Sequence, residues 1–374
     1  MNVVPNTTRP IGQAETFFLA MMTLPIMGRA ILGPLLLQVA GRDAWLSALL
    51  TLPLAVVFVW TLWLVRRNTH GEPQAILIGT TGNLSGKFLA PFFSAYFFFL
   101  SMLSVVFVVD MVHIYFFPET PSWALTGFYV LFMMYAVQKD VWSIAMTATI
   151  FGIIMMFTEN SAAFLSFPQK DLAEIQPLME FGWHPVVWGC IVILSMWTEL
   201  LFLLFIPIRR STYMIRKNMP KGWWMLVLAN AYMTFSSLLG VVAFFGFHMA
   251  RNYTYPSAEE LSLLSLGLID RFSVYVIINM SFFCFIRTSL YFRLGYELIL
   301  PHTQQNKMKP WFQKVLTIFI LAALGYTANC IASDHVRVVQ WTEYYTYTAA
   351  LFIIPFILYG VQRIRTHLRV GNSS

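Results

Sequence analysis

Residues 23–34 read TLPIMGRAILGP and lie in the middle of the first long apolar segment of the chain. The two prolines and two glycines of this stretch can interrupt a membrane helix and free backbone groups from helical hydrogen bonds. In transporters, such groups hold a small ligand near the middle of the bilayer. The alternative is that proline and glycine are simply tolerated in a membrane helix. The residues of this stretch expected to line a ligand pocket are Thr23, Met27, Gly28 and Ala30.

The composition of the whole chain is that of a membrane protein. Of its 374 residues, 58% are hydrophobic and 11% are charged, whereas soluble domains carry about 25% charged residues. The apolar runs are long and continuous, which excludes a β-barrel with its alternating pattern. Basic residues on the cytoplasmic side of a membrane protein explain the net charge of +7. The predicted surroundings are therefore a lipid bilayer, and no nucleic acid partner is predicted.

The number of spans follows from the apolar runs, because about 20 apolar residues cross the hydrocarbon core of a bilayer. This rule predicts an all-α polytopic membrane protein with ten transmembrane helices. They lie near Glu15–Gln38, Ala44–Val65, Phe88–Phe117, Ser122–Val137, Val141–Phe164, Pro185–Ile208, Trp223–His248, Phe272–Ile299, Val315–Ile331 and Tyr344–Val361.

The basic residues predict how the chain is oriented. With a cytoplasmic N-terminus, 17 of the 24 Lys and Arg residues lie in cytoplasmic segments and 5 in outer segments. The remaining two, Arg29 and Arg287, lie inside spans. Such an asymmetry in short loops is the usual sign of the cytoplasmic side. We therefore predict an integral membrane protein whose N- and C-termini are both cytoplasmic.

The ten spans divide into five plus five, as in the LeuT-type fold with its inverted repeats and broken helices 1 and 6. We expect a single integral membrane domain over residues 1–374. Its parts are spans 1–5 at about 15–164, an outer loop at about 166–184, spans 6–10 at about 185–361 and a cytoplasmic tail at 362–374.

The sixth span has a polar centre, SMWTE at residues 195–199, which places Glu199 deep in the membrane. A charge there costs about 2.5–3.5 kcal/mol on insertion scales, so it needs a function or a partner. We predict that Glu199 binds a ligand amine or responds to protons, with Trp197 and Thr198 beside it in the pocket. The alternative is a neutral, hydrogen-bonded helix contact.

Arg287 in the eighth span is the other deep charge. It is predicted to face the pocket together with Tyr291, one helical turn further along the same face. The alternative is that its side chain extends to the cytoplasmic interface. On the third span, Phe98 and Met102 share a face and are expected to wall the pocket, with plain packing as the alternative.

Other polar residues give no sign of an enzyme. Asp110 and Glu159 lie near the outer ends of spans and are expected to contact water. The seven histidines are spread mostly over loops and span ends, and none pairs with an acidic residue at a metal-ligand or general-base spacing. No phosphate-binding glycine-rich loop and no nucleophile motif is present. We therefore predict neither catalysis nor a metal or cofactor.

Six short motifs occur in order along the chain: IG at 11–12, GRDAWLS at 41–47, PETPSW at 118–123, PLMEFG at 177–182, WTE at 197–199 and IDRF at 269–272. Together they resemble the spore germination permease family, the B subunits of nutrient germinant receptors. That family belongs with the amino acid–polyamine–organocation transporters. The resemblance covers nearly the whole chain and implies a pocket formed by spans 1, 3, 6 and 8. One departure is Thr198, which stands where the family usually has glycine.

The resemblance also implies a function. The chain is expected to bind a small nutrient, an amino acid, and to trigger germination together with partner A and C subunits in the spore inner membrane or cell membrane. A ligand can drive such a change only through its different affinities for two conformations. The alternative is a proton-coupled amino acid permease that carries solute across the membrane, with Glu199 as its proton-binding group.

Overall fold

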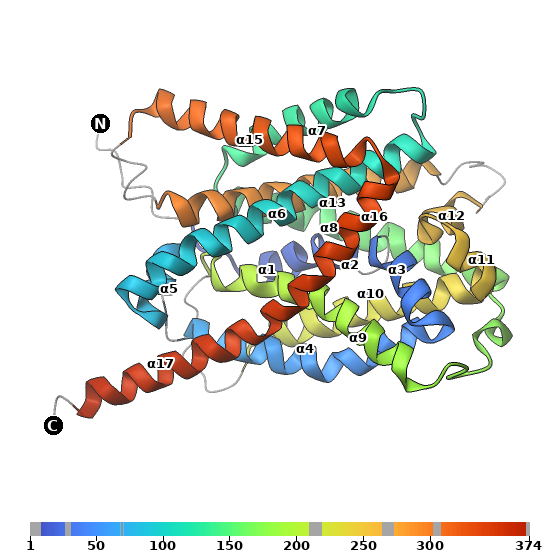
Figure 1. The fold of residues 1–374 in the computed structure, drawn as a ribbon, viewed down its shortest axis with the longest axis horizontal. Helices are drawn as coiled ribbons and strands as arrows, with labels where there is room; N and C mark the ends of the chain where they lie inside the picture. The colour runs from blue at the N-terminus through green and yellow to red at the C-terminus, as the bar shows by residue number, and fades with distance from the viewer. Residues whose placement is uncertain are drawn as a thin grey trace.

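The computed structural model describes residues 9–26, 31–67, 69, 71–208, 219–263, 273–301 and 308–371. Helices make up nearly all of these residues (Figure 1), and their only β feature is an isolated bridge between Ile11 and Ile208. The helices are α1 (Gln13–Met21), α2 (Leu24–Ile26), α3 (Leu32–Val39), η2 (Gly41–Asp43), α4 (Ala44–Arg67), α5 (Pro73–Thr81), α6 (Asn83–Tyr115), α7 (Ser122–Val137), α8 (Val141–Ser166), η3 (Phe167–Gln169), η4 (Leu172–Ile175), α9 (Trp183–Thr198), η5 (Glu199–Leu204), α10 (Lys221–Phe245), α11 (Phe247–Asn252), α12 (Pro256–Ser262), α13 (Ser273–Ile299), α15 (Pro310–Ala332), α16 (His335–Thr346), η6 (Tyr347–Ile353) and α17 (Ile354–Gly371).

Eight helical segments within the described residues are long and apolar enough to cross a membrane. This confirms the predicted class, an all-α polytopic membrane protein. The other two predicted spans take a different form. Ser122–Val137 is a 16-residue apolar helix, and Glu15–Gln38 is divided among α1, α2 and α3. The total of ten spans and the five-plus-five repeat stay predictions.

The first predicted span is interrupted after α1. Its last turn is closed by the side chain of Thr23, whose hydroxyl donates to the carbonyls of Leu19 and Ala20, each at 3.1 Å. Pro25 then has no backbone N–H to continue a helical hydrogen-bond ladder. The helix α3 begins only at Leu32. The predicted ligand residues Met27, Gly28 and Ala30, and also Arg29, lie outside the described residues.

The sixth predicted span changes its helix type at its polar centre. The α-helix α9 ends at Thr198, and the six residues of η5 continue it as a tighter 3₁₀ helix. A 3₁₀ stretch within a longer helix often marks a hinge or a functional site. The expected break in this span is therefore a tightening that begins at Glu199, and the helix is not unwound there.

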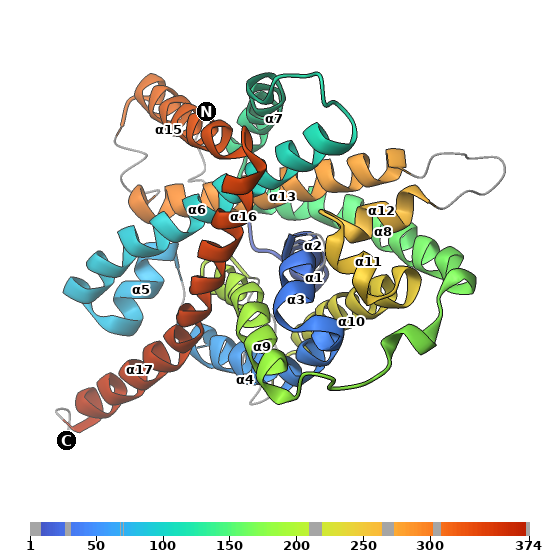
Figure 2. The same ribbon diagram turned by 45° about the vertical axis from the view of Figure 1, so that its right-hand side comes forward.

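The helices α6 and α13 lie side by side along most of their length (Figures 1 and 2). Their close approach depends on Gly295, where an added Cβ would lie 3.2 Å from the backbone oxygen of Ser94. The hydroxyl of Ser94 donates to the Gly295 carbonyl at 2.7 Å, and that of Ser101 donates to the Thr288 carbonyl at 3.1 Å. In Figure 2, the interrupted first span runs through the centre of the bundle, between this pair and α9 and α10.

Segments predicted to share a side of the membrane lie at the same end of the bundle. At the predicted cytoplasmic end, the N–H of Ile11 donates to the carbonyl of Pro207 at 2.6 Å. At the predicted outer end, the Asp43 carboxylate accepts the N–H of Met179 at 3.0 and 3.1 Å. The grouping agrees with the predicted loops, and which end faces the cytoplasm stays a prediction.

Candidate ligand site

A buried ion pair joins the sixth and eighth predicted spans. Glu199 is the first residue of η5, and Arg287 lies in the middle of α13. The Arg287 Nη2 atom lies 2.6 Å from Oε1 of Glu199, and Nε lies 3.2 Å from Oε2. The two side chains are 0% and 1% exposed. Each charge therefore neutralises the other, which is how an apolar interior tolerates both.

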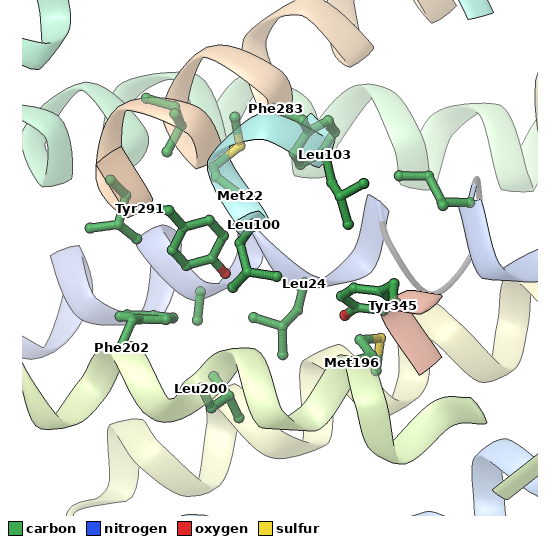
Figure 3. Close-up of a cluster of buried hydrophobic side chains, with 14 of the residues drawn as sticks. Met22, Leu24, Leu100, Leu103, Met196, Leu200, Phe202, Phe283, Tyr291 and Tyr345 are labelled. Atoms are coloured by element: carbon green, nitrogen blue, oxygen red, sulfur yellow. The ribbon is translucent and has the colours of Figure 1, made fainter. Parts of the chain in front are cut away.

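Two tyrosines and a serine complete the hydrogen bonding of this pair. Tyr291 donates to Oε2 of Glu199 and Tyr345 donates to Oε1, each at 2.6 Å. The Nη1 atom of Arg287 donates to the Ser104 hydroxyl at 2.8 Å. Figure 3 shows Tyr291 and Tyr345 entering the same buried cluster from different helices. This network, which we call the Glu199–Arg287 cluster, ties together α6, η5, α13 and α16.

The interrupted first span lies against this cluster. Met22 and Leu24 are 1% and 0% exposed. In Figure 3, Leu24 occupies the centre of the view, with Leu100 of α6 on one side and Leu200 of η5 on the other. The residues that follow α1 are thus packed between α6, which carries Ser104, and η5, which begins with Glu199.

A small cavity opens beside the ion pair, and we call it the inner cavity. Its volume is about 20 Å³, enough for about one water molecule. Its polar wall is formed by Ser104, Cys284 and Arg287, and the rest is apolar. Cys284 donates its thiol hydrogen to the Ser104 carbonyl at 3.1 Å. Arg287 therefore borders the cavity directly.

A second cavity, the outer cavity, lies toward the predicted outer end and measures about 160 Å³. It is lined by α3, α6, α16, the end of α11 and residues 253–255 between α11 and α12. Ile31, Phe107 and Tyr255 line both cavities. These three side chains are therefore the partition between the outer cavity and the Glu199–Arg287 cluster.

The partition is held by Asp110 of α6. Its Oδ2 atom accepts the Tyr255 hydroxyl at 2.5 Å and lies 2.9 Å from Nδ1 of His335. Burial, and then the neighbouring Asp110 carboxylate, raise the pKa of Tyr255 well above its ordinary value. Tyr255 is therefore a lasting hydrogen-bond donor to Asp110.

The expectation that Asp110 and Glu159 contact water is wrong. Asp110 is 2% exposed because the segment that carries Tyr255 covers it. Glu159 is 9% exposed and faces a cavity between α8 and α13. Hydropathy along the chain does not reveal this covering, because it depends on a loop that folds back over the helix ends.

Three of the predicted ligand residues meet in the cluster: Glu199, Arg287 and Tyr291. The alternative that Arg287 extends to the cytoplasmic interface is wrong, since the side chain is 1% exposed and paired with Glu199.

The other described candidates surround the cluster or lie outside it. Thr198 is buried beside it, with its hydroxyl 3.1 Å from that of Tyr96, and Trp197 is 1% exposed. Phe98 and Met102 line neither the inner nor the outer cavity as the described residues form them. Phe98 instead packs edge-on against Phe292 at 5.3 Å.

Sequence reasoning missed Ser104, Tyr345 and Asp110 as parts of the site. Ser104 and Asp110 are two of the polar residues within the apolar third span, where such residues need a partner. Tyr345 lies in the run WTEYYTY at residues 341–347, which is typical of an aromatic belt at a membrane interface and gives no sign of a deep contact.

Comparison with known proteins places the chain in a family. The model of a family described as "Spore germination protein" matches residues 11–331. The chain belongs to the spore germination protein family. Spore germination protein XB of Bacillus anthracis is 27% identical over 257 residues, which are 67% of this chain and 70% of that protein. Spore germination protein GerQB of Bacillus cereus is 22% identical over 247 residues, 66% and 67% of the two chains. The putative spore germination protein YfkT of Bacillus subtilis is 23% identical over 168 residues, 44% and 46%.

Membership in the spore germination protein family gives the chain a role in spore germination as an integral membrane protein. The matched region includes both members of the buried ion pair, together with Asp110 and Tyr255. Two partners of the site, His335 and Tyr345, follow the matched region in α16.

Proposed function

We propose that this protein is the nutrient-binding subunit of a spore germinant receptor and that its nutrient is an amino acid. The observation that carries the proposal is the buried Glu199–Arg287 pair beside the inner cavity. An amino acid brings one ammonium and one carboxylate. The ligand ammonium would take the place of Arg287 as the partner of Glu199. The ligand carboxylate would take the place of Glu199 as the partner of Arg287.

The sizes of the cavities supply a reason for a conformational change. The inner cavity, at about 20 Å³, is too small for any amino acid, whereas the outer cavity, at about 160 Å³, is large enough for a small one. A nutrient reaches Arg287 only if the partition of Ile31, Phe107 and Tyr255 moves. Binding then favours the conformation in which the two cavities join, and this population shift is the signal.

Two contacts close the predicted cytoplasmic end of the bundle, which lies opposite the outer cavity. The Ile11–Pro207 hydrogen bond ties the residues before α1 to the end of the sixth span. Arg66 adds a second tie, because its Nη2 donates to the Ile206 carbonyl at 3.0 Å. This arrangement supports access from the predicted outer side. The proposed A and C subunits would respond to this conformational change in the spore inner membrane.

A permease coupled to protons through Glu199 is supported less well. Both carboxylate oxygens of Glu199 already accept hydrogen bonds, two each, from Arg287, Tyr291 and Tyr345. Protonation of Glu199 would leave Arg287 as an unpaired buried charge, which is strongly unfavourable. A proton carrier needs a group that gains and loses its proton at low cost.

Two measurements on the full chain test the proposal. Thermal unfolding in detergent with each of the twenty amino acids should identify at least one that raises the unfolding temperature, because a ligand of the folded state stabilises it. Proteoliposomes should then bind the radiolabelled amino acid without concentrating it. Stabilisation by none of the twenty would contradict the amino acid assignment, and accumulation against a gradient would favour the permease.

A further inference from the structure

A further cavity bordered by described residues lies away from the Glu199–Arg287 cluster. It measures about 350 Å³ and is bordered by α8, α10, α12 and α13, of which α12 contacts the other three (Figure 2). Met280 is the one described residue that it shares with the inner cavity, and it shares none with the outer cavity. We call it the amine cavity, for the reasons that follow.

Three hydroxyl groups of this cavity already use their hydrogen as a donor. Thr158, Ser161 and Ser236 each donate their single hydrogen to a carbonyl of their own helix, at 3.0, 2.8 and 3.4 Å. A hydroxyl that donates to its helix presents lone pairs to whatever else it faces. These residues therefore offer the cavity acceptors and no free donors.

A buried amide adds an acceptor that lacks a donor. Asn279 of α13 lines the cavity, is 7% exposed, and its Oδ1 atom has no hydrogen-bond partner. An unsatisfied buried polar atom is energetically unfavourable, so a ligand that donates a hydrogen bond to it removes that cost. Glu159 also lines the cavity but is already engaged within the protein.

The charged side chains of the cavity also favour a cationic ligand over an anionic one. Lys170 is the one cationic side chain among the described lining residues, and its Nζ lies 2.8 Å from Oε1 of Glu260. Gly240 leaves room for this ammonium, which lies 2.9 Å from where a Cβ would stand. Lys170 is thus held by its own counter-ion, and no other cationic side chain among the described lining residues is available to pair with a ligand carboxylate or phosphate.

We propose that the amine cavity binds a small organic ammonium ion with an apolar body and no carboxylate. Its N–H groups would donate to Oδ1 of Asn279 and to the hydroxyl oxygens described above. Its apolar body would pack on Met233, Val276 and Met280. This ligand class differs from the amino acid proposed for the first site. A phospholipid headgroup fits less well, because the one cationic side chain among the described lining residues, Lys170, is already paired with Glu260.

The test uses phenethylamine, with phenethyl alcohol and phenylacetate as neutral and anionic counterparts of similar shape. Titration calorimetry on the full chain in detergent should detect binding of the amine and not of the other two. Asn279→Leu should weaken binding of the amine about tenfold or more, as expected for losing a hydrogen bond to a charged donor. Asn279→Asp should strengthen it.

Asn230→Leu is the matched control. Asn230 is also a fully buried asparagine with an unpartnered Oδ1, but it does not line the cavity. Its replacement should leave the affinity for phenethylamine unchanged. If Asn279→Leu does not accumulate in the membrane, the Asn279→Asp variant decides. Tighter binding of phenylacetate than of the amine, or an affinity unaltered by Asn279→Asp, would overturn the proposal.

Discussion

Arg287 reaches Glu199 from a helix 88 residues further along the chain, and the two side chains form two hydrogen bonds in the bundle core. The two residues lie in the sixth and eighth predicted spans, so any relative movement of η5 and α13 has to stretch or break this pair. Removing one partner of a buried ion pair typically costs about 3–5 kcal/mol. The pair is therefore both a stabilising contact and a constraint on conformational change.

Glu199→Gln should destabilise the protein. Glutamine keeps the shape of the side chain, but it leaves Arg287 charged and without a counter-ion. We expect a loss of about 3–5 kcal/mol in the free energy of unfolding, together with lower abundance in the membrane. Thermal unfolding in detergent and immunoblotting of membranes measure these effects.

The control for this variant removes both charges. Glu199→Leu combined with Arg287→Met leaves no unpaired charge, so the double variant should lose less stability than Glu199→Gln alone. Both should lose the response to nutrient. An unfolding temperature of Glu199→Gln equal to that of the parent protein would show that Glu199 is a neutral helix contact.

The charged centre of the site could be predicted from the sequence, but its pairing could not. Glu199 and Arg287 stand out because they are ionisable residues deep in apolar segments, and Tyr291 follows Arg287 by one helical turn. Which deep charge meets which other one depends on the packing of α9 and η5 against α13. Single-span reasoning therefore assigned each charge to a ligand, whereas the folded chain lets them satisfy each other.

The helices were predicted more reliably than what covers them. Hydropathy located most spans to within a few residues, and the Pro and Gly of the first span predicted its interruption. The position of Asp110 near a helix end predicts contact with water, but its exposure depends on what covers that end. The segment between α11 and α12 folds back so that Tyr255 shields this carboxylate, and no local pattern in the sequence indicates that contact.

Tyr255→Phe should open the partition between the two cavities. It removes only the hydroxyl that donates to Asp110, and the loss of a hydrogen bond to a charged group costs about 1.5–3 kcal/mol. Native Cys284 lines the inner cavity and can report the opening once Cys190 and Cys330 are replaced by serine. We expect about tenfold faster labelling of Cys284 by a membrane-impermeant maleimide.

Tyr253→Phe is the matched control for that experiment. Tyr253 also lines the outer cavity, but its ring packs against Phe245 at 4.8 Å instead of joining the contact with Asp110. Its variant should label at the parent rate. Equal labelling rates for the Tyr255 and Tyr253 variants would show that the Asp110 contact does not hold the partition closed.

The orientation of the chain can be tested with single cysteines in a background without native cysteines. Leu178 is 56% exposed in the predicted outer loop, and Lys221 is exposed at the start of α10 on the predicted cytoplasmic side. Leu178→Cys should react with an impermeant maleimide in intact cells, and Lys221→Cys only after permeabilisation. The opposite result would reverse the orientation, and reaction of both in intact cells would contradict the span between them.

Arg287→Lys should separate the role of charge from the role of geometry at the proposed nutrient site. Arg287 uses Nε and Nη2 for Glu199 and Nη1 for Ser104, a planar set of donors that a lysine ammonium cannot reproduce. The charge remains, so we expect a smaller loss of stability than for Glu199→Gln. The half-maximal nutrient concentration should still rise about tenfold or more, because the planar guanidinium that would receive the ligand carboxylate is gone.

Arg66→Lys is the matched control: Arg66 is also buried and donates to two carbonyls, but at the predicted cytoplasmic end. It should lose stability while keeping the parent half-maximal concentration. A normal nutrient response in Arg287→Lys would remove Arg287 from the ligand site and leave it a role in packing alone.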